Sequence, residues 1–346
     1  TVGANGDVNG NGNTYVAYLF GHETDASSMV QCGGYTGTGS NGNFVSLGWQ
    51  PQWVMVKRTD AAGAWEIQDS MRGIVEGRLT MLEANTSATE VDASTANCLS
   101  LTGTGFNVNG AGGSNNANGG TYVYMAIRAP MMIAPTVGTD VFAIHNQAGA
   151  YTSPTNVGFP VDLSIMAKRT GQSLNSTVGD RLRGFSKFLS TSKTNADDTG
   201  IDWQFDLQNN FQSTWTTDTI SWMWKRAKSY FDVLAYTGNS SNRNLSHNLA
   251  VAPEMVWFKS RSSTVDWIVY HKDLGGTYPS SRNYLYLNQS GGVVAVYQPF
   301  TAAPTASTMA LSASSGTNSS GVNYIAYLFA TLAGVSKVGS VTHSGT

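Results

Sequence analysis

Oxygen-bearing side chains near the start of the chain could bind a metal. Asp7-Val8-Asn9-Gly10-Asn11-Gly12 opens like a calcium loop, with oxygen ligands at positions 1, 3 and 5 and glycine at position 6. Such a loop needs a bidentate Glu at position 12, and Tyr18 stands there. The comparable segments Asn115–Gly119 and Asn318–Gly321 contain no acid. A turn with glycine at positive φ explains all three segments, so we predict turns and neither a metal site nor a cofactor.

Glu66 could take part in sugar cleavage. Some lectin-like sandwiches carry acids at i, i+2 and i+4 on one strand, where they act as nucleophile, helper and general acid. In the segment around Glu66, Gln68 and Ser70 fall on the same face of a strand, whereas Asp69 points to the other face. The paired carboxylates are therefore missing from this strand.

Other residues of catalytic type are scattered. Asp197, Asp198 and Asp202 form a second acidic cluster, which we interpret as a solvated loop. The histidines lie in no recognisable nucleophile motif, and a Walker-type phosphate loop is missing. We therefore expect no catalytic residue and a protein that is not an enzyme.

Aromatic rings are the strongest binding candidates, because the apolar face of a sugar stacks on a flat ring. Trp49 and Trp53 flank Gln50-Pro51-Gln52 and are expected to be partly exposed. Lys57 and Arg58 end the same predicted strand. Like the basic pairs that end two later predicted strands, Lys168-Arg169 and Lys259 with Arg261, they are expected to carry charge at the surface, where they could meet a neighbouring unit. Trp49, Trp53, Lys57 and Arg58 are our candidate ligand contacts.

Three further tryptophans could present rings in the same way. Trp257 lies in a predicted strand, and Trp65 and Trp267 each follow a lysine by eight residues, Lys57 and Lys259. Recurrence at one position of a repeat is what core packing produces, so Trp65 and Trp267 are predicted to lie in a core.

The elements that would position these residues repeat along the chain. Thr14–Phe20 returns almost unchanged as Asn323–Phe329, with weaker copies at Thr121–Ile127 and Thr219–Lys225. The same sixteen-residue offset separates the lysine that ends a predicted strand from a later glycine in three places, which are Lys57 and Gly73, Lys168 and Gly184, and Lys259 and Gly275. A constant offset through divergent sequence indicates homologous units.

The repeats divide the chain into units. A predicted turn of the form Tyr-Thr-Gly recurs at Tyr35–Gly37, Tyr151–Ser153 and Tyr236–Gly238 and marks the start of each unit. We predict one unit at residues 35–130, a divergent one at 151–228 and a third at 236–332. Residues 1–34 are expected to contain the closing strand of a preceding repeat, or an N-terminal arm. Residues 333–346 are expected to lead into a further repeat or to form a tail. Both faces of the Thr14–Phe20 segment are apolar, so we expect a central strand covered on both sides.

Composition favours an all-β fold. Charged residues make up 12% of the chain, where about 25% is usual, and Gly, Ser, Thr and Asn take their place. The aromatic content of 11% is too high for a disordered chain. Short β-branched or aromatic runs lie between turn residues, and sustained helical periodicity is missing. We predict tandem antiparallel β-sandwiches of the jelly-roll, concanavalin-like type.

Charge and hydropathy exclude several classes of protein. A net charge of −2 lacks the basic surface that nucleic-acid binding requires. The longest apolar stretch, residues 324–335, is shorter than the roughly 20 residues needed to cross a bilayer. Cys32 and Cys98 are too few for a disulfide framework and leave the redox compartment open.

The recurring segments resemble an uncharacterised repeat of bacteriophage virion proteins, especially tail and fibre proteins of marine and cyanobacterial phages. Asn323–Ala330, Val335–Gly339, Pro253–Lys259 and Asp180–Gly184 carry this resemblance, which spans nearly the whole chain through its repeats. It implies concanavalin-type jelly rolls and a module on the virion surface, used for host adhesion or for decoration. The middle unit departs from the pattern because it lacks the recurring tryptophan.

These observations lead to one main hypothesis. We expect a non-enzymatic virion protein at the surface of an extracellular particle, part of a tail fibre or receptor-binding appendage that adheres to host glycans. Its expected partners are copies of itself, as a homo-oligomer, or neighbouring virion proteins, without nucleic acid or membrane insertion. The alternatives are a capsid-decorating or filament-forming protein and, third, a polysaccharide depolymerase that uses Glu66 or the Asp197–Asp202 cluster.

Overall fold

The computed structural model is built almost entirely of β-strands, with 41% of residues in strands and 3% in helices. It describes residues 3, 5–22, 28–74, 78–95, 97–129, 132–147, 155–170, 175–183, 186–201, 203–205, 210–213, 218–279, 282–295 and 299–342. These residues form several antiparallel sheets, which confirms the predicted all-β sandwich fold.

The first sandwich pairs a large sheet with a small one. The large sheet has the strand order β1-β9-β3-β4-β5-β6, and the small sheet has the order β2-β8-β7. The strands are β1 (Val30–Thr36), β2 (Asn43–Ser46), β3 (Pro51–Arg58), β4 (Trp65–Asp69), β5 (Arg78–Glu83), β6 (Val91–Ser94), β7 (Leu99–Thr102), β8 (Gly105–Val108) and β9 (Thr121–Arg128).

The second sandwich repeats this plan. Its large sheet has the order β10-β18-β12-β13-β14-β15, and its small sheet has the order β11-β17-β16. The elements are η1 (Gly138–Asp140), β10 (Phe142–Gln147), β11 (Thr155–Asn156), β12 (Leu163–Lys168), β13 (Thr177–Asp180), β14 (Lys187–Ser190), β15 (Asp198–Thr199), β16 (Trp203–Gln204), β17 (Asn210–Ser213) and β18 (Thr219–Trp224).

The third sandwich has a large sheet of order β19-β25-β21-β22-β23 and a small pair β20-β24. The elements are β19 (Phe231–Thr237), β20 (Arg243–Ser246), β21 (Met255–Ser260), β22 (Ile268–His271), η2 (Lys272–Leu274), β23 (Leu285–Tyr286), β24 (Thr308–Leu311) and β25 (Asn323–Phe329). In all three sandwiches the last strand closes the large sheet by inserting between the opening strand and the third strand.

The three units begin closer to the N-terminus than predicted, because each starts with an opening strand. β1, β10 and β19 precede the expected starts at residues 35, 151 and 236. The reason is that the Tyr-Thr-Gly turn ends an opening strand instead of preceding the unit, as at Tyr35 and Tyr236. Two landmarks of the middle unit, Tyr151–Ser153 and Gly184, lie outside the described residues.

The turns predicted in the three glycine-rich segments are confirmed. Gly12, Gly119 and Gly321 have φ angles of 79°, 76° and 72°, which only glycine adopts without strain. The structure adds two buried asparagines that sequence reasoning missed. Asn116 Nδ2 donates to the carbonyl of Gly110 at 2.7 Å, and Asn318 Nδ2 donates to that of Ser241 at 2.7 Å. Each of these side chains ties neighbouring loops together at the same position of its sandwich.

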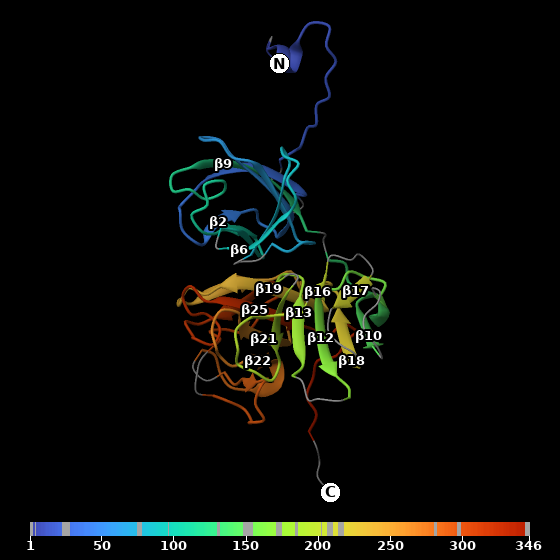
Figure 1. Cartoon of the computed structure of the whole chain (residues 1–346). Coiled ribbons are helices and arrows are strands. Elements are labelled where there is room, and N and C mark those ends of the chain that lie inside the picture. The colour runs from blue at the N-terminus through green and yellow to red at the C-terminus, as the bar shows by residue number, and fades with distance from the viewer. Residues whose placement is uncertain are drawn as a thin grey trace.

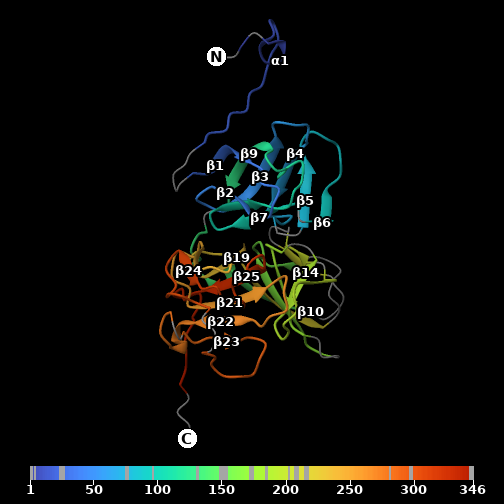
Figure 2. The same cartoon turned by 90° about the vertical axis from the view of Figure 1, so that its left-hand side faces the viewer.

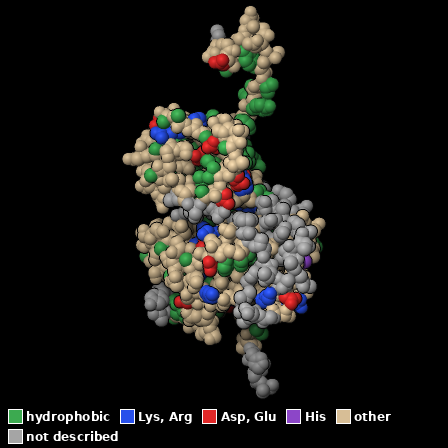
Figure 3. Space-filling view, in the orientation of Figure 1, with side chains coloured by type: hydrophobic (Ala, Val, Ile, Leu, Met, Phe, Trp, Pro, Cys, Tyr) green, Lys and Arg blue, Asp and Glu red, His purple; other side chains and the backbone are tan. Residues whose placement is uncertain are grey.

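The N-terminal arm, residues 5–22, projects away from the first sandwich (Figure 1). It holds the short helix α1 (Gly6–Asn9), to whose Gly6 carbonyl the Tyr15 hydroxyl donates at 2.6 Å. The expected strand at Thr14–Phe20 does not form among the described residues, and Leu19 is 90% exposed. Hydrophobic side chains of the arm therefore lie at the surface (Figure 3).

The equivalent strand β25 is covered on both faces. Tyr324, Ala326 and Leu328 point into the core of the third sandwich. Ile325 and Tyr327 point the other way, into a second cluster shared between sandwiches. An apolar strand of this type is stable where sheets cover both of its faces.

The sandwiches pack into an elongated molecule. The second and third lie side by side with their large sheets facing, and the first lies above them, so that the arm and the C-terminal tail leave from opposite ends (Figures 1 and 2). Gln50 of the first sandwich accepts a hydrogen bond of 3.2 Å from Arg226, which follows β18. Among the described residues no helix has the length and apolarity to cross a membrane. Cys32 and Cys98 are not joined in a disulfide.

Candidate functional site

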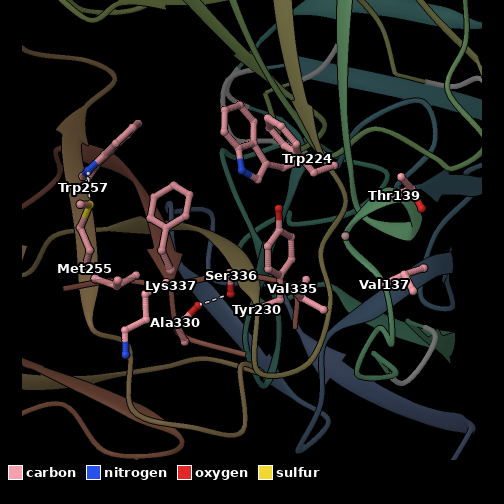
Figure 4. A pocket seen from close by; sticks show the side chains of 14 residues that line it. Val137, Thr139, Trp224, Tyr230, Met255, Trp257, Ala330, Val335, Ser336 and Lys337 are labelled. Carbon is pink, nitrogen blue, oxygen red and sulfur yellow. Dashed lines mark hydrogen bonds between the residues drawn. The ribbon is translucent and has the colours of Figure 1, made fainter. Parts of the chain in front are cut away.

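A cavity of about 610 Å³ opens where the large sheets of the second and third sandwiches meet. Two pairs of aromatic rings form its walls. Phe142 and Trp224 of the second sandwich lie with ring centroids 5.0 Å apart, and Trp257 and Phe329 of the third lie 5.0 Å apart. Figure 4 shows rings from both sandwiches around the same space.

Strand alternation puts these rings outside the sandwich cores. On β18, Met223 points into the core of the second sandwich, so Trp224 must point outward. On β21, Val256 and Phe258 fill the third core, so Trp257 points outward. Each sandwich thus contributes outward-facing aromatics, and the facing of the two sheets creates the cavity between them.

The chain after β25 forms another side of the cavity. Leu332 and Ser336 close a tight turn, and the Ser336 hydroxyl donates to the Ala330 carbonyl at 2.7 Å. The hydroxyl end of Tyr230 projects into the space (Figure 4). Among the described residues that line the cavity, Lys337 is the one with a charged side chain.

This lining suits binding. Aromatic faces contact the apolar faces of a ligand, while the Tyr230 hydroxyl, Ser336 and Lys337 offer polar groups at the edges. Among the described lining residues, Tyr230 and Lys337 have ionisable side chains, whereas no carboxylate, imidazole or thiol is present. Across the described residues no group of three His, Cys, Asp or Glu could hold a metal ion.

A buried ionic network beside the cavity fixes the two sandwiches together. Arg183 is fully buried, forms a salt bridge with Asp180 and donates to Asp197 at 3.2 Å. Tyr327 of the third sandwich donates its hydroxyl hydrogen to Asp180 at 2.6 Å, and Arg261 donates to Asp197 at 3.1 Å. Burial raises the pKa of Tyr327 well above its ordinary value, so its hydroxyl stays protonated and remains a donor.

This network corrects two sequence predictions. Asp197 was expected in a solvated loop, but its side chain is 10% exposed and pairs with two arginines. The basic residues that end β21 were expected at the surface, but Lys259 is fully buried and donates to the Thr194 carbonyl at 3.1 Å. Burial lowers the pKa of Lys259 to about 8. The expected contact with a neighbouring unit is present here. Asp202 lies outside the described residues.

The four predicted ligand contacts lie on the first sandwich, away from the cavity. Trp49 is only 3% exposed, so the expected partial exposure is wrong for this residue, whose ring packs in the core. Trp53 is half-buried, as expected. Lys57 Nζ donates to the Gly63 carbonyl at 2.6 Å, and Arg58 pairs with Asp60 at 2.9 Å. Their role in ligand binding stays a prediction.

The recurring tryptophans Trp65 and Trp267 differ in burial. Trp267 is fully buried and donates to the Ser190 carbonyl of the second sandwich at 2.9 Å, which confirms the predicted core position. Trp65, at the same repeat position, is 37% exposed, so that prediction is wrong. The reason is that the second sandwich covers this face of the third, whereas none of the described sandwiches covers the same face of the first.

Glu66 points into the first sandwich and is 4% exposed. Asn115 Nδ2 donates to it at 3.3 Å, and Glu83 lies opposite on β5. Burial raises the pKa of Glu66, and hydrogen bonds from Ser114 and Asn115 offset part of this rise. Glu83 could not be predicted from the sequence, because the pairing of β4 with β5 is not visible in the chain order. Glu66 is a buried carboxyl group of the sandwich interior and lies outside the cavity lining.

Comparison with known proteins gives a family. Neither curated proteins nor solved structures match the chain. One family model, described as a domain of unknown function (DUF7483), matches residues 1–129 and 142–346. Because this match covers more than half of the sequence, the chain belongs to the family of domains of unknown function DUF7483.

Proposed function

We propose that the chain is a non-enzymatic adhesion module on the surface of a bacteriophage virion, as part of a tail fibre or receptor-binding appendage. Its ligand is a host-surface glycan, bound in the cavity between the second and third sandwiches. The virion setting derives from the resemblance of the repeats, and the ligand class derives from the cavity.

One observation carries the proposal. Two outward-facing aromatic pairs, one from each sandwich, line a cavity of about 610 Å³. That volume lies within the range of roughly 300–1,000 Å³ usual for ligand sites. A pyranose ring offers apolar C–H faces for Trp224 and Trp257, and hydroxyl groups for Tyr230 and Ser336 at the edge. The buried network at Arg183 holds both walls in a fixed relation, so little ordering free energy is lost on binding.

The test is binding to a broad array of bacterial surface glycans. We compare the wild-type chain with Thr139→Trp, which adds a large ring at an exposed position of the cavity lining. Ala303→Trp, at an exposed loop position of the third sandwich, is the matched control. We expect wild type and Ala303→Trp to bind the same glycans and Thr139→Trp to lose binding. Absence of wild-type binding on the array, or equal binding by Thr139→Trp, would contradict the proposal.

A structural role in capsid decoration or filament formation is the second candidate. The exposed Thr14–Phe20 segment favours it, because its sequence matches a strand that is elsewhere covered on both faces. Electron microscopy of the particle separates the two roles. Density for the sandwiches over the head supports decoration, and density projecting from the tail supports adhesion.

A depolymerase gains less support. Its candidate acids are Glu66, inside the first sandwich, and Asp197, in the ionic network. Reducing-end release from host capsule that Glu66→Gln abolishes would revive this alternative.

A further inference from the structure

The outer face of the large sheet in the first sandwich is open and carries an apolar row, with Lys57 on one side of this row and the Asp69–Arg72 ion pair on the other. The row runs across five neighbouring strands through Cys32, Met125, Met55, Ile67 and Leu82, as the strand registers show. Each of these side chains keeps part of its surface exposed, and Leu82 is 39% exposed. A contiguous apolar face of this kind marks an interaction surface.

Beside this row, Trp65 and Val123 add two further apolar side chains to the outer face. Trp65 on β4 lies opposite Lys57 on β3, which in turn lies opposite Val123 on β9. Trp65 is 37% and Val123 is 41% exposed. The face therefore combines large aromatic, sulfur-containing and branched side chains, which are typical of the centre of protein interfaces.

The same positions are buried in the third sandwich. Trp267 corresponds to Trp65 and Ile325 to Val123, and both are fully buried. They belong to the cluster that joins the third sandwich to the second, together with Leu163, Val178 and Leu189 of the second. Within this chain, the outer face of one sandwich thus packs on the outer face of another sandwich of the same strand order.

We propose that the outer face of the first sandwich, centred on Met55 and Ile67, binds the same face of a second copy of this chain. The contact is isologous, so each copy contributes an identical apolar face across a two-fold axis. The occupant follows from the internal precedent, because a sandwich of this topology already covers the equivalent face within the chain. This surface lies apart from the cavity, so its test does not depend on glycan binding.

The first test is the mass of the full chain in solution by analytical ultracentrifugation. We expect a dimer with a dissociation constant of about 1 μM or below, as an apolar interface of this kind supports. Ile67→Lys places a charge at the centre of the face and is expected to weaken the dimer at least about 100-fold. Ile144→Lys is the matched control, because Ile144 is a 59% exposed strand residue of the second sandwich. It is expected to leave the dimer intact.

A second measurement avoids substitution altogether. Cys32 lies in the apolar row and is partly exposed, whereas Cys98 is fully buried and serves as an internal control. We expect thiol labelling of Cys32 to slow as the wild-type concentration rises, with Cys98 unreactive throughout. A wild-type monomer at about 100 μM, a dimer that survives Ile67→Lys, or Cys32 labelling that is independent of concentration would each overturn the proposal.

Discussion

Tyr327 of the third sandwich donates its hydroxyl hydrogen to Asp180 of the second, 2.6 Å away. Asp180 also pairs with Arg183, which itself donates to the Tyr327 oxygen at 3.0 Å. These residues come from distant parts of the chain and meet in a fully buried position. The contact explains why the two sandwiches present a single cavity with walls from both.

Substitution of Arg183 should strongly destabilise the folded chain. Arg183→Met leaves Asp180 buried without its cation and removes one of the two arginines that pair with Asp197, so we expect a loss of about 3–5 kcal/mol in the free energy of unfolding. Tyr327→Phe removes the two hydrogen bonds that the hydroxyl donates to Asp180 and accepts from Arg183, and should cost about 1–3 kcal/mol. Urea denaturation measures both, and Lys193→Met at an exposed position serves as control. Equal stabilities for Arg183→Met and the control would show that the network contributes nothing.

The two recurring tryptophans should respond differently to truncation. Trp267→Ala empties a fully buried site and should cost about 3–5 kcal/mol. Trp65→Ala removes a 37% exposed ring and should cost less, measured at concentrations where the chain is monomeric. Thermal unfolding of both variants by circular dichroism makes the comparison. Similar losses would mean that Trp65 is covered as fully as Trp267, which the second sandwich covers.

Much of the fold follows from the sequence, because a closing strand, a basic strand end and a glycine recur in a fixed order. The sequence does not show which sheet faces are covered by a neighbouring sandwich. Trp65 and Trp267 stand at one repeat position, yet only the neighbour of the third sandwich buries its tryptophan. Burial at such a site depends on contacts between residues far apart in the chain, which local patterns do not contain.

The cavity could not be predicted from the sequence either. Its walls come from β10, β18, β21 and β25, so no local motif encodes it. One signal was present, since Trp222 and Trp224 alternate with the core residue Met223 on β18. Outward aromatics at every second position predict a covered outer face. Trp257 was recognised as a candidate ring, but its partner Phe329 was not.

Glu66 makes stability depend on pH. Its pKa is higher in the folded chain than in the unfolded chain because it is buried. The folded state therefore holds its proton longer, and stability falls as the pH rises above the ordinary value of 4.5. Glu66→Gln should raise the melting temperature at pH 7 and make little difference below pH 4.5. A variant less stable than wild type at pH 7 would contradict this account of Glu66.

Proteases should cut the N-terminal arm but not β25, although the two segments have similar sequences. Tyr18 is 83% exposed, whereas Tyr327, at the same position of β25, is fully buried. Brief chymotrypsin treatment should cut the arm near Tyr18 and leave β25 intact, as mass spectrometry of the fragments will show. Loss of the arm should leave the melting temperature unchanged. A marked fall would mean that the arm packs on the sandwiches.

Binding of one glycan to variants of two tryptophans tests most directly whether the cavity is the glycan site. Isothermal titration with an oligosaccharide that binds the wild-type chain is repeated on Trp257→Ala, in the cavity, and on Trp53→Ala, the candidate on the first sandwich. We expect Trp257→Ala to lose affinity at least about tenfold, or about 1.4 kcal/mol, and Trp53→Ala to bind with unchanged affinity. Loss confined to Trp53→Ala would contradict the cavity as the binding site.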